Sequence, residues 1–213
     1  MIKNVHYDGW ELPFFDAAVN FRNYQIKIIK KHIKGSVSEI GPGNGSLCEK
    51  YYKYCGDITL FEPSRNFSKD LKERFNNISN IEVIESTFYP SEKKFDSILL
   101  MDVLEHVENP ETLIKKLYEN LKIGGKILIN VPAFEHLYSN FDKDVGHLKR
   151  YNKNSLLKET ALITPQNIEM FYYDSIGYFL SLFSKISSLF FKNYKKNFQQ
   201  KIAFWNFLMP VSS

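Results

Sequence analysis

The sequence predicts an α/β protein whose sheet is doubly wound and mostly parallel, and three observations carry that prediction. Short apolar runs rich in Val, Ile and Leu alternate with longer amphipathic segments along most of the chain. A glycine-rich turn over 41–45 follows the first run, and an acidic residue, Glu62, closes the second. Strands that alternate with helices in this way form parallel sheets with helices on both faces.

The composition restricts the class of protein. The chain has 213 residues, of which 44% are hydrophobic, so it can bury a core and disorder is not expected. A net charge of +4 is too mild to indicate a nucleic-acid partner. Cys48 and Cys55 form no CxxC motif and are expected to be reduced thiols. Since no signal peptide or membrane-spanning run is visible, we expect a cytoplasmic protein.

The first predicted helix covers residues 16–34 and ends at Gly35. Its apolar side chains recur at nearly helical spacing, and basic side chains take most of the other positions. Two functions are open for this part of the chain. The helix covers an edge of the sheet, or Tyr7, Trp10 and Tyr24 help to close the site over a ligand.

The glycine-rich turn separates the first two predicted strands, 37–40 and 58–61. Glycine lacks a Cβ, so it tolerates positive φ and lets a ligand approach the backbone closely. The helix that follows offers free N–H groups to an anion or a carboxylate. An acid at the position of Glu62 hydrogen-bonds ribose hydroxyls in doubly wound folds. The layout therefore predicts a nucleoside cofactor.

Two such cofactors fit this layout, a dinucleotide and S-adenosylmethionine. The dinucleotide fingerprint requires a third glycine where Ser46 stands. The spacing is instead E-x-G-x-G-x-G from Glu39, and a buried acid there would repel a pyrophosphate but could orient a cationic amino group. This stretch resembles the class I S-adenosylmethionine-dependent methyltransferases, which have a Rossmann-like fold, and we expect S-adenosylmethionine as the cofactor.

The later elements complete the predicted sheet. Strand 95–101 is nearly continuously apolar, as expected of a central strand that is covered on both faces. Gly124 and Gly125 form the turn before the fifth strand. After the second strand, the predicted elements are a helix over 64–76, strand 81–85, strand 95–101, a helix that begins at Pro110, and strand 126–131.

A second stretch strengthens the resemblance, which extends over about residues 24–175. The run D-V-L-E-H-V begins at Asp102, and after a helix comes L-K-I-G-G-K-I-L-I-N-V-P. The resemblance implies that Glu39 orients the cofactor's amino group and that Glu62 takes the ribose hydroxyls. Ser86 or Thr87 stands where an acid usually lies beside the adenine, unless this is a plain polar loop. The implied cofactor-binding residues are Glu39, Gly41, Pro42, Gly43, Asn44, Glu62, Pro63, Ser86, Thr87, Asp102 and Val103.

The loop after the fifth strand resembles that of a branch associated with bacterial glycan and lipid-glycan biosynthesis, with Lys149 in place of a usual arginine. His147 is the candidate base, or a structural histidine that ties the loop to a carbonyl. Arg150 is the candidate anchor of an anionic acceptor, or a loop-bridging cation. His106 is expected to pack rather than to act as a base. No set of His, Cys and acidic residues has metal-ligand spacing, so we predict no metal.

The expected function is methyl transfer to a small-molecule acceptor, on an oxygen of a sugar, a lipid-linked glycan or a related metabolite. N-methylation of a small molecule and a non-catalytic role in cofactor binding or assembly are the alternatives. A nicotinamide-dependent oxidoreductase is disfavoured by the missing third glycine. A nucleic-acid methyltransferase is disfavoured because the fourth strand ends in D-V-L-E rather than in an N-P-P-Y-like motif.

The C-terminal part is expected to depart from the usual fold. A helix over 152–161 and a sixth strand over 168–173 are predicted, without the final antiparallel strand, so 1–175 is the domain and 176–213 a helical tail. A basic amphipathic tail can lie on the inner face of a membrane through 176–208, cover the pocket, pack into the core or form a homodimer face. Its apolar stripe is Phe179, Leu182, Phe183, Ile186, Leu189 and Phe190, followed by Lys192, Lys195, Lys196 and Lys201.

Overall fold

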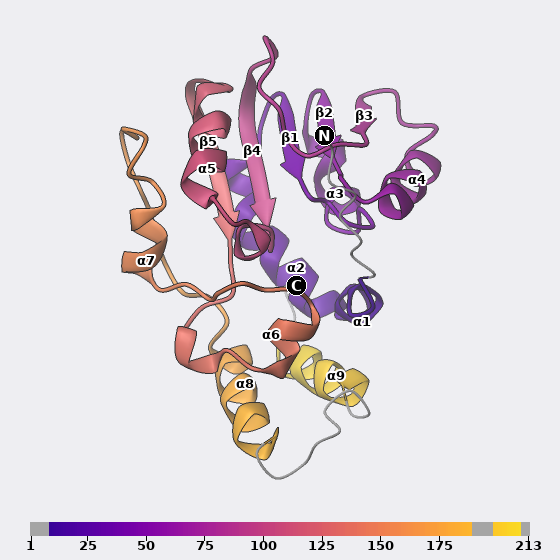
Figure 1. Cartoon of the computed structure of the whole chain (residues 1–213). Helices are drawn as coiled ribbons and strands as arrows, with labels where there is room; N and C mark the ends of the chain where they lie inside the picture. Colours follow the sequence, from indigo (N-terminus) through magenta and orange to yellow (C-terminus); the bar gives the residue numbers. More distant parts are fainter. Residues whose placement is uncertain (1–8, 189–197, 210–213) are drawn as a thin grey trace.

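The computed structural model describes residues 9–188 and 198–209, and its centre is a sheet of five parallel strands (Figure 1). This confirms the predicted fold class. The strand order is β3-β2-β1-β4-β5, so it reverses between β1 and β4, where such sheets bind ligands. The strands are β1 (Val37–Ile40), β2 (Ile58–Phe61), β3 (Ile81–Ile84), β4 (Phe95–Met101) and β5 (Leu121–Asn130).

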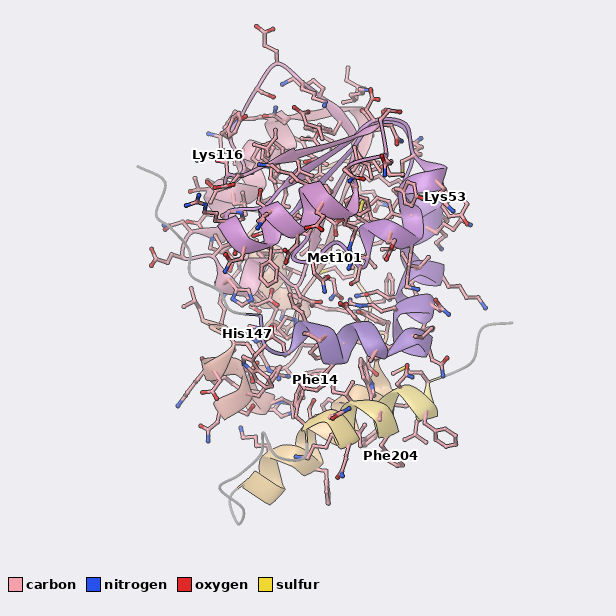
Figure 2. All side chains as sticks on the ribbon, turned by 90° about the vertical axis from the view of Figure 1, so that its right-hand side faces the viewer. Phe14, Lys53, Met101, Lys116, His147 and Phe204 are labelled. Atoms are coloured by element: carbon pink, nitrogen blue, oxygen red, sulfur yellow. The ribbon has the colours of Figure 1, made fainter. Side chains whose placement is uncertain are left out.

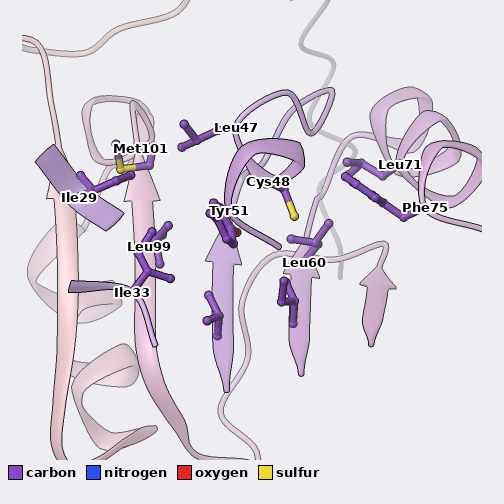
Figure 3. Close-up of a cluster of buried hydrophobic side chains, with 12 residues drawn as sticks. Ile29, Ile33, Leu47, Cys48, Tyr51, Leu60, Leu71, Phe75, Leu99 and Met101 are labelled. Atoms are coloured by element: carbon purple, nitrogen blue, oxygen red, sulfur yellow. The ribbon is translucent and has the colours of Figure 1, made fainter. Parts of the chain in front are cut away.

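Helices cover both faces of the sheet. Successive side chains of a strand point to opposite faces, and the side chains of β1 and β2 are buried at every position, so both faces need to be covered. On one face, α2 (Val19–Ile29), α3 (Cys48–Tyr51) and α4 (Arg65–Arg74) enclose a buried cluster around Tyr51 and Leu60 (Figure 3). On the other face, α5 (Pro110–Glu119) packs through Ile114 and Leu117, and α7 (Lys153–Lys158) flanks it through Leu156. These two cores hold the carboxyl ends of the strands in place.

The single helix expected over 16–34 is wrong in two respects, because the helical segment begins earlier, at Leu12, and because the chain breaks at Ala18. The segment consists of α1 (Leu12–Ala17), α2 and a short helix, η1 (Lys30–His32). Ala18 has φ −80° and ψ 64°, outside the helical region, and its methyl is buried against the C-terminal helices. The break lets α1 turn across the glycine-rich turn, where a Cβ built on Gly43 would lie 3.3 Å from Leu12.

The sixth strand expected over 168–173 is not formed. This segment is irregular, and its side chains have partners other than a neighbouring strand. Tyr172 stacks on the ring of Phe134, at 4.7 Å between centroids. The hydroxyl of Tyr173 donates to Asn130 Oδ1 at 2.8 Å. The aromatic run that ends at Tyr173 therefore crosses the end of the sheet and does not extend its edge.

Two smaller boundaries also differ from the expectation. Gly124 and Gly125 lie inside β5 rather than before it, where the pairing with β4 shifts in register between Phe95 and Ser97. Gly124 has φ +75°, which glycine tolerates best. The helix expected over 152–161 is shorter, because α7 begins after a capping box formed by Asn152 and Ser155 and ends at Lys158.

The C-terminal tail is helical, as predicted, in α8 (Ser175–Ser188) and α9 (Phe198–Leu208). Figure 1 shows both helices beyond the carboxyl ends of the strands, next to α6 (Asn140–Asp144). Within the described ranges, no helix is long and apolar enough to cross a membrane. The predicted tail residues Leu189, Phe190, Lys192, Lys195 and Lys196 lie outside the described residues.

Candidate active site

A cavity of about 1700 Å³ lies at the carboxyl ends of the strands, and residues of the sheet and of the C-terminal helices line it. The glycine-rich turn after β1, the segment after β4 and the loop after β5 all contribute to its wall. Figure 2 shows Met101 at the end of β4, with His147 and Phe14 between it and α9, which carries Phe204. One cavity thus joins the predicted cofactor residues to the predicted acceptor residues.

The glycine-rich turn has the conformation that its sequence demands. Gly41 and Gly43 have φ of 63° and 57°, in the left-handed region that side chains rarely adopt. A Cβ on Gly41 would lie 2.9 Å from a methyl of Val103, so the turn after β1 and the segment after β4 are in close contact. The side chain of Asn44 closes the turn by accepting from the N–H of Ser46 and donating to Asp16 of α1.

Two buried acids flank this turn. Glu39 accepts a hydrogen bond from the Tyr51 hydroxyl at 2.5 Å, but burial outweighs that bond and raises the pKa of Glu39 to about 7. Glu62 accepts from the N–H groups of Gly43 at 3.0 Å and Ser64 at 2.8 Å, and burial again raises its pKa to about 7. Both side chains line the cavity, so a cation or a hydroxyl donor entering it would favour their ionised forms.

The segment after β4 has an unusual backbone. Asp102 has φ 59°, which is uncommon for a residue other than glycine, and its Oδ1 accepts from Asn130 at 2.6 Å. Backbone strain of this kind persists where the surrounding structure imposes it, often at functional sites. Of the other predicted cofactor residues, Pro42, Pro63, Thr87 and Val103 line the cavity, whereas Ser86 does not.

At the other end of the cavity, one carboxylate organises the loop after β5. Asp142 is fully buried in α6, and its Oδ1 lies 2.8 Å from His147 Nδ1 and 2.8 Å from Arg150 Nε. Burial by itself would raise the pKa of Asp142, but the hydrogen bonds from His147 and Arg150 lower it to about 2. Arg150 also donates to the carbonyl of Ala133 at 3.4 Å. His147 and Arg150, the two predicted acceptor residues, are therefore brought together and oriented by Asp142.

A second acid faces His147 from η3 (Leu104–His106). Glu105 is fully buried, and neither of its carboxylate oxygens has a hydrogen bond to another residue of the described part of the chain. Its Oε1 lies 3.7 Å from His147 Nε2. Burial, together with the charges of Asp102 and Asp142, raises the pKa of Glu105 well above its usual range.

His106 completes this group. Its Nδ1 lies 3.1 Å from the carbonyl of Gly146, and burial lowers the pKa of His106 to about 4, so the ring is neutral. Ligand atoms of Glu105, His106 and His147 lie within 4.8 Å of one another. Linear spacing hid this arrangement, because the fold joins residues of η3 to a residue from the distant loop after β5.

Arg22 is a cavity residue that the sequence did not reveal, because the basic side chains of the first helix were expected at positions other than its apolar ones. Its side chain is 11% exposed and lines the cavity, where it donates to Gln25 and faces Asp16 at 3.8 Å. A signal was present, because Arg22 falls at the same helical spacing as the apolar residues. Trp10 and Tyr24 pack on aromatic side chains and do not line the cavity, and Tyr7 lies outside the described residues.

The sequence model of a family described as a methyltransferase domain matches residues 26–182. An uncharacterised protein of Methanocaldococcus jannaschii, MJ1123, is 30% identical over 165 residues, which are 72% of this chain and 75% of that protein. A ubiquinone biosynthesis O-methyltransferase of Coxiella burnetii is 28% identical over 114 residues, 50% of this chain but only 45% of the enzyme.

Solved structures share the fold. A coclaurine N-methyltransferase, solved with N-methylheliamine and SAH bound, superimposes with a TM-score of 0.55 and 18% identity over 90% of this chain and 65% of that one. This likeness concerns the fold alone, since the identity is low. The family model covers well over half of the sequence and includes the glycine-rich turn, the segment after β4 and the loop after β5. The chain therefore belongs to the methyltransferase domain family.

Proposed function

We propose that this protein transfers the methyl group of S-adenosylmethionine to an oxygen of a small-molecule acceptor, of the class of sugars, lipid-linked glycans or related metabolites. The observation that carries the proposal is the single cavity, which joins the turn between Glu39 and Glu62 to the cluster around His147. Methyl transfer requires the donor and the acceptor to lie in line within one enclosed space.

The residues at the sheet end of the cavity fit the cofactor. S-adenosylmethionine supplies an electrophilic methyl group on a sulfonium, and it carries a cationic amino group. Glu39 is buried beside the turn and suits that amino group, while Glu62 at the end of β2 suits the ribose hydroxyls. The positive φ values of Gly41 and Gly43 leave their backbone open to the methionine part.

The residues at the far end fit an acceptor whose proton must be removed. Asp142 accepts from His147 Nδ1, which fixes the proton on that nitrogen and leaves Nε2 as the basic atom that faces Glu105. We therefore assign to His147 the removal of the acceptor's proton. Arg150 has guanidinium donors beyond those that bind Asp142 and Ala133, and it lines the cavity, so we assign to it an anionic group of the acceptor.

An amine acceptor is the second candidate, and one observation favours it. The buried carboxyl of Glu105 has no hydrogen bond to another described residue, and an amine acceptor that enters as an ammonium group would compensate its charge. The ammonium then loses a proton to His147, which leaves a lone pair on nitrogen to attack the methyl carbon. In that case methyl transfer goes to nitrogen rather than oxygen.

The tail has two candidate roles at this site. Leu180 and Phe183 of α8 line the cavity, which supports a covering role. Phe179 and Phe183 are 67% and 69% exposed, so this face could also meet a membrane or the lipid of a lipid-linked acceptor. We favour the cover. Flotation with anionic liposomes tests this choice, because a cover predicts that the protein stays in the unbound fraction.

Calorimetry tests the proposal first. We expect S-adenosylmethionine and S-adenosylhomocysteine to bind, NADH not to bind, and Glu62→Ala to weaken both of the first two. Transfer of a radiolabelled methyl group from the cofactor to sugar, lipid-linked and amine acceptors then identifies the product, and its mass spectrum distinguishes O- from N-methylation. Binding of NADH in place of S-adenosylmethionine would contradict the proposal.

A further inference from the structure

We propose that Glu105, His106 and His147 form a binding site for one divalent transition-metal ion at the acceptor end of the cavity. Whether the three residues bind an ion does not depend on the methyl-transfer reaction. The role that we give the ion in that reaction rests on the proposed function.

The geometry of the three side chains suits a single ion. Their ligand atoms lie within 4.8 Å of one another, and Glu105 Oε1 is 3.7 Å from His147 Nε2. Ligands at about 2.0–2.2 Å from one ion lie roughly 3–3.5 Å apart in a tetrahedral or octahedral arrangement. Small rotations of the side chains therefore bring them to bonding distance. The two imidazole rings are edge to face, with centroids 4.9 Å apart, so their nitrogens can converge without a clash.

The state of Glu105 is the second observation. A carboxyl group that is fully buried and has no hydrogen bond to another residue of the described part of the chain carries a large desolvation penalty if it ionises. Proteins compensate buried acids with a cation, a hydrogen-bond donor or a metal ion. Glu105 is among the residues that line the cavity, so the three ligands lie at the cavity wall.

The surroundings of the two histidines are the third observation. His147 Nδ1 is held by the Asp142 carboxylate at 2.8 Å, and His106 Nδ1 by the carbonyl of Gly146 at 3.1 Å. Histidines that bind metals usually donate their other ring N–H to a carboxylate or a backbone carbonyl, which fixes the tautomer. Both rings therefore have the outer partners that a metal-binding histidine needs.

The ligand set indicates the class of metal. Two imidazoles and one carboxylate suit Zn²⁺, Fe²⁺, Mn²⁺ or Co²⁺, whereas Mg²⁺ and Ca²⁺ prefer oxygen ligands alone. Only three protein ligands are available within the described residues, so at least one coordination position stays open toward the cavity. Open positions of this kind are typical of catalytic rather than structural metal sites.

The open position gives the ion a role in the proposed reaction. Coordination lowers the pKa of an acceptor hydroxyl, so its proton passes to solvent at neutral pH. An electron pair of that oxygen then bonds to the methyl carbon, and the carbon–sulfur bond breaks with its electrons on sulfur, leaving S-adenosylhomocysteine. When Nε2 of His147 binds the ion, that nitrogen no longer takes the acceptor's proton. The ion then activates the acceptor hydroxyl, whereas His147 does so in the metal-free protein.

The test uses the full chain after treatment with a chelator and dialysis. Co²⁺ and Zn²⁺ are titrated by calorimetry, and Co²⁺ also by visible absorption. We expect one ion per chain, a Co²⁺ spectrum typical of nitrogen and oxygen ligands, and binding at least 100-fold weaker in Glu105→Gln and in His147→Gln. His136→Gln is the matched control, because His136 is a histidine outside the cluster and should bind as the unaltered chain does.

The outcomes separate this site from the proposed function. Calorimetry with S-adenosylhomocysteine and circular dichroism on the same variants check the cofactor site and the fold. The proposal is overturned if Co²⁺ binds no better than to an unfolded control, or equally well to Glu105→Gln while that variant stays folded. Cofactor binding that persists in that case leaves the proposed function intact. Equal methyl transfer by the chelated and the Zn²⁺-loaded chain would overturn the role of the ion in the reaction.

Discussion

Asp142 Oδ1 lies 2.8 Å from His147 Nδ1, so a buried carboxylate fixes the orientation and the tautomer of the histidine that faces the acceptor end of the cavity. The same oxygen accepts from Arg150 Nε at 2.8 Å. One acid in a short helix therefore positions both residues to which we assign the acceptor. The relation holds whether His147 takes a proton or binds a metal ion, because both roles need Nε2 to carry the lone pair.

Asp142→Asn tests this relation. The amide is nearly isosteric but uncharged, and its NH₂ group cannot accept from the Ser139 N–H and hydroxyl as Asp142 Oδ2 does. It therefore holds His147 and Arg150 less firmly, and we expect kcat to fall about 10²-fold or more. Affinity for S-adenosylhomocysteine should be unchanged, because Asp142 lies away from the glycine-rich turn. Asp144→Asn, an exposed position in the same helix, is the control and should leave kcat unchanged. Equal rates for the two variants would show that Asp142 has no part in catalysis.

The two raised pKa values predict how cofactor binding depends on pH. In the cofactor-free protein, burial raises the pKa of both Glu39 and Glu62 to about 7. The cationic amino group of S-adenosylmethionine favours an ionised Glu39, so we expect its affinity to increase from pH 6 to pH 8. Calorimetry at three pH values measures the change, and Glu39→Gln should remove most of it. An affinity that is independent of pH would place the amino group elsewhere.

The same shifts affect the stability of the cofactor-free chain in the opposite direction. A carboxyl group whose pKa is higher in the folded state than in the unfolded state holds protons more tightly when folded. The contribution of Glu39 and Glu62 to the free energy of unfolding is therefore complete below about pH 4.5 and is lost as the pH rises through about 7. Urea unfolding at pH 6 and pH 8 should show a decrease that Glu39→Gln reduces.

Two glycines separate backbone strain from contact at the turn. Gly41 and Gly124 both have positive φ, but a Cβ on Gly41 would lie 2.9 Å from Val103, whereas Gly124 has nothing within 4 Å. We expect both alanine variants to lose about 1–2 kcal/mol from the left-handed backbone. Only Gly41→Ala should also lose cofactor binding, measured by calorimetry on protein that melts cooperatively. Cofactor binding that survives in Gly41→Ala would argue against the turn as the cofactor site.

Most of the fold was predictable because its signals are local. The first strand, 37–40, and the fourth, 95–101, have the predicted bounds, since a continuous apolar run leaves little choice of element. Segment 168–173 shows where local pattern fails. Its apolar and aromatic side chains predict a strand. In the structure, Tyr173 instead donates a hydrogen bond to Asn130 and Tyr172 stacks on Phe134, and both contacts join residues far apart in the sequence.

The site was predictable to the extent that motifs are contiguous. The turn around Gly41 and the run from Asp102 were visible because each lies in one stretch of sequence. Arg22 was missed because a basic residue on a helix is usually exposed to solvent. In the structure, its guanidinium instead faces Asp16 and lines the cavity. The cluster of Glu105 with His147 depends on how the loop after β5 folds back, which no single stretch encodes.

The contact between Phe21 and Trp205 attaches the C-terminal helices to the rest of the molecule. The two ring centroids are 4.1 Å apart, Trp205 is 6% exposed, and its Nε1 donates to Asp174 at 3.2 Å. Because α2 also carries Arg22 into the cavity, this contact links the tail to the site. Removing the indole should therefore loosen one wall of the cavity.

Trp205→Ala tests this link. Loss of a buried indole should lower the free energy of unfolding by about 3–5 kcal/mol, less if α9 detaches without unfolding the sheet. Phe207→Ala is the control, since Phe207 is 78% exposed in the same helix and should change stability by less than about 0.5 kcal/mol. Urea unfolding and hydrogen exchange of α2 measure the two effects. If α2 exchanges equally fast in both variants, the tail is independent of the helix that lines the cavity, and deleting it should leave cofactor affinity unchanged.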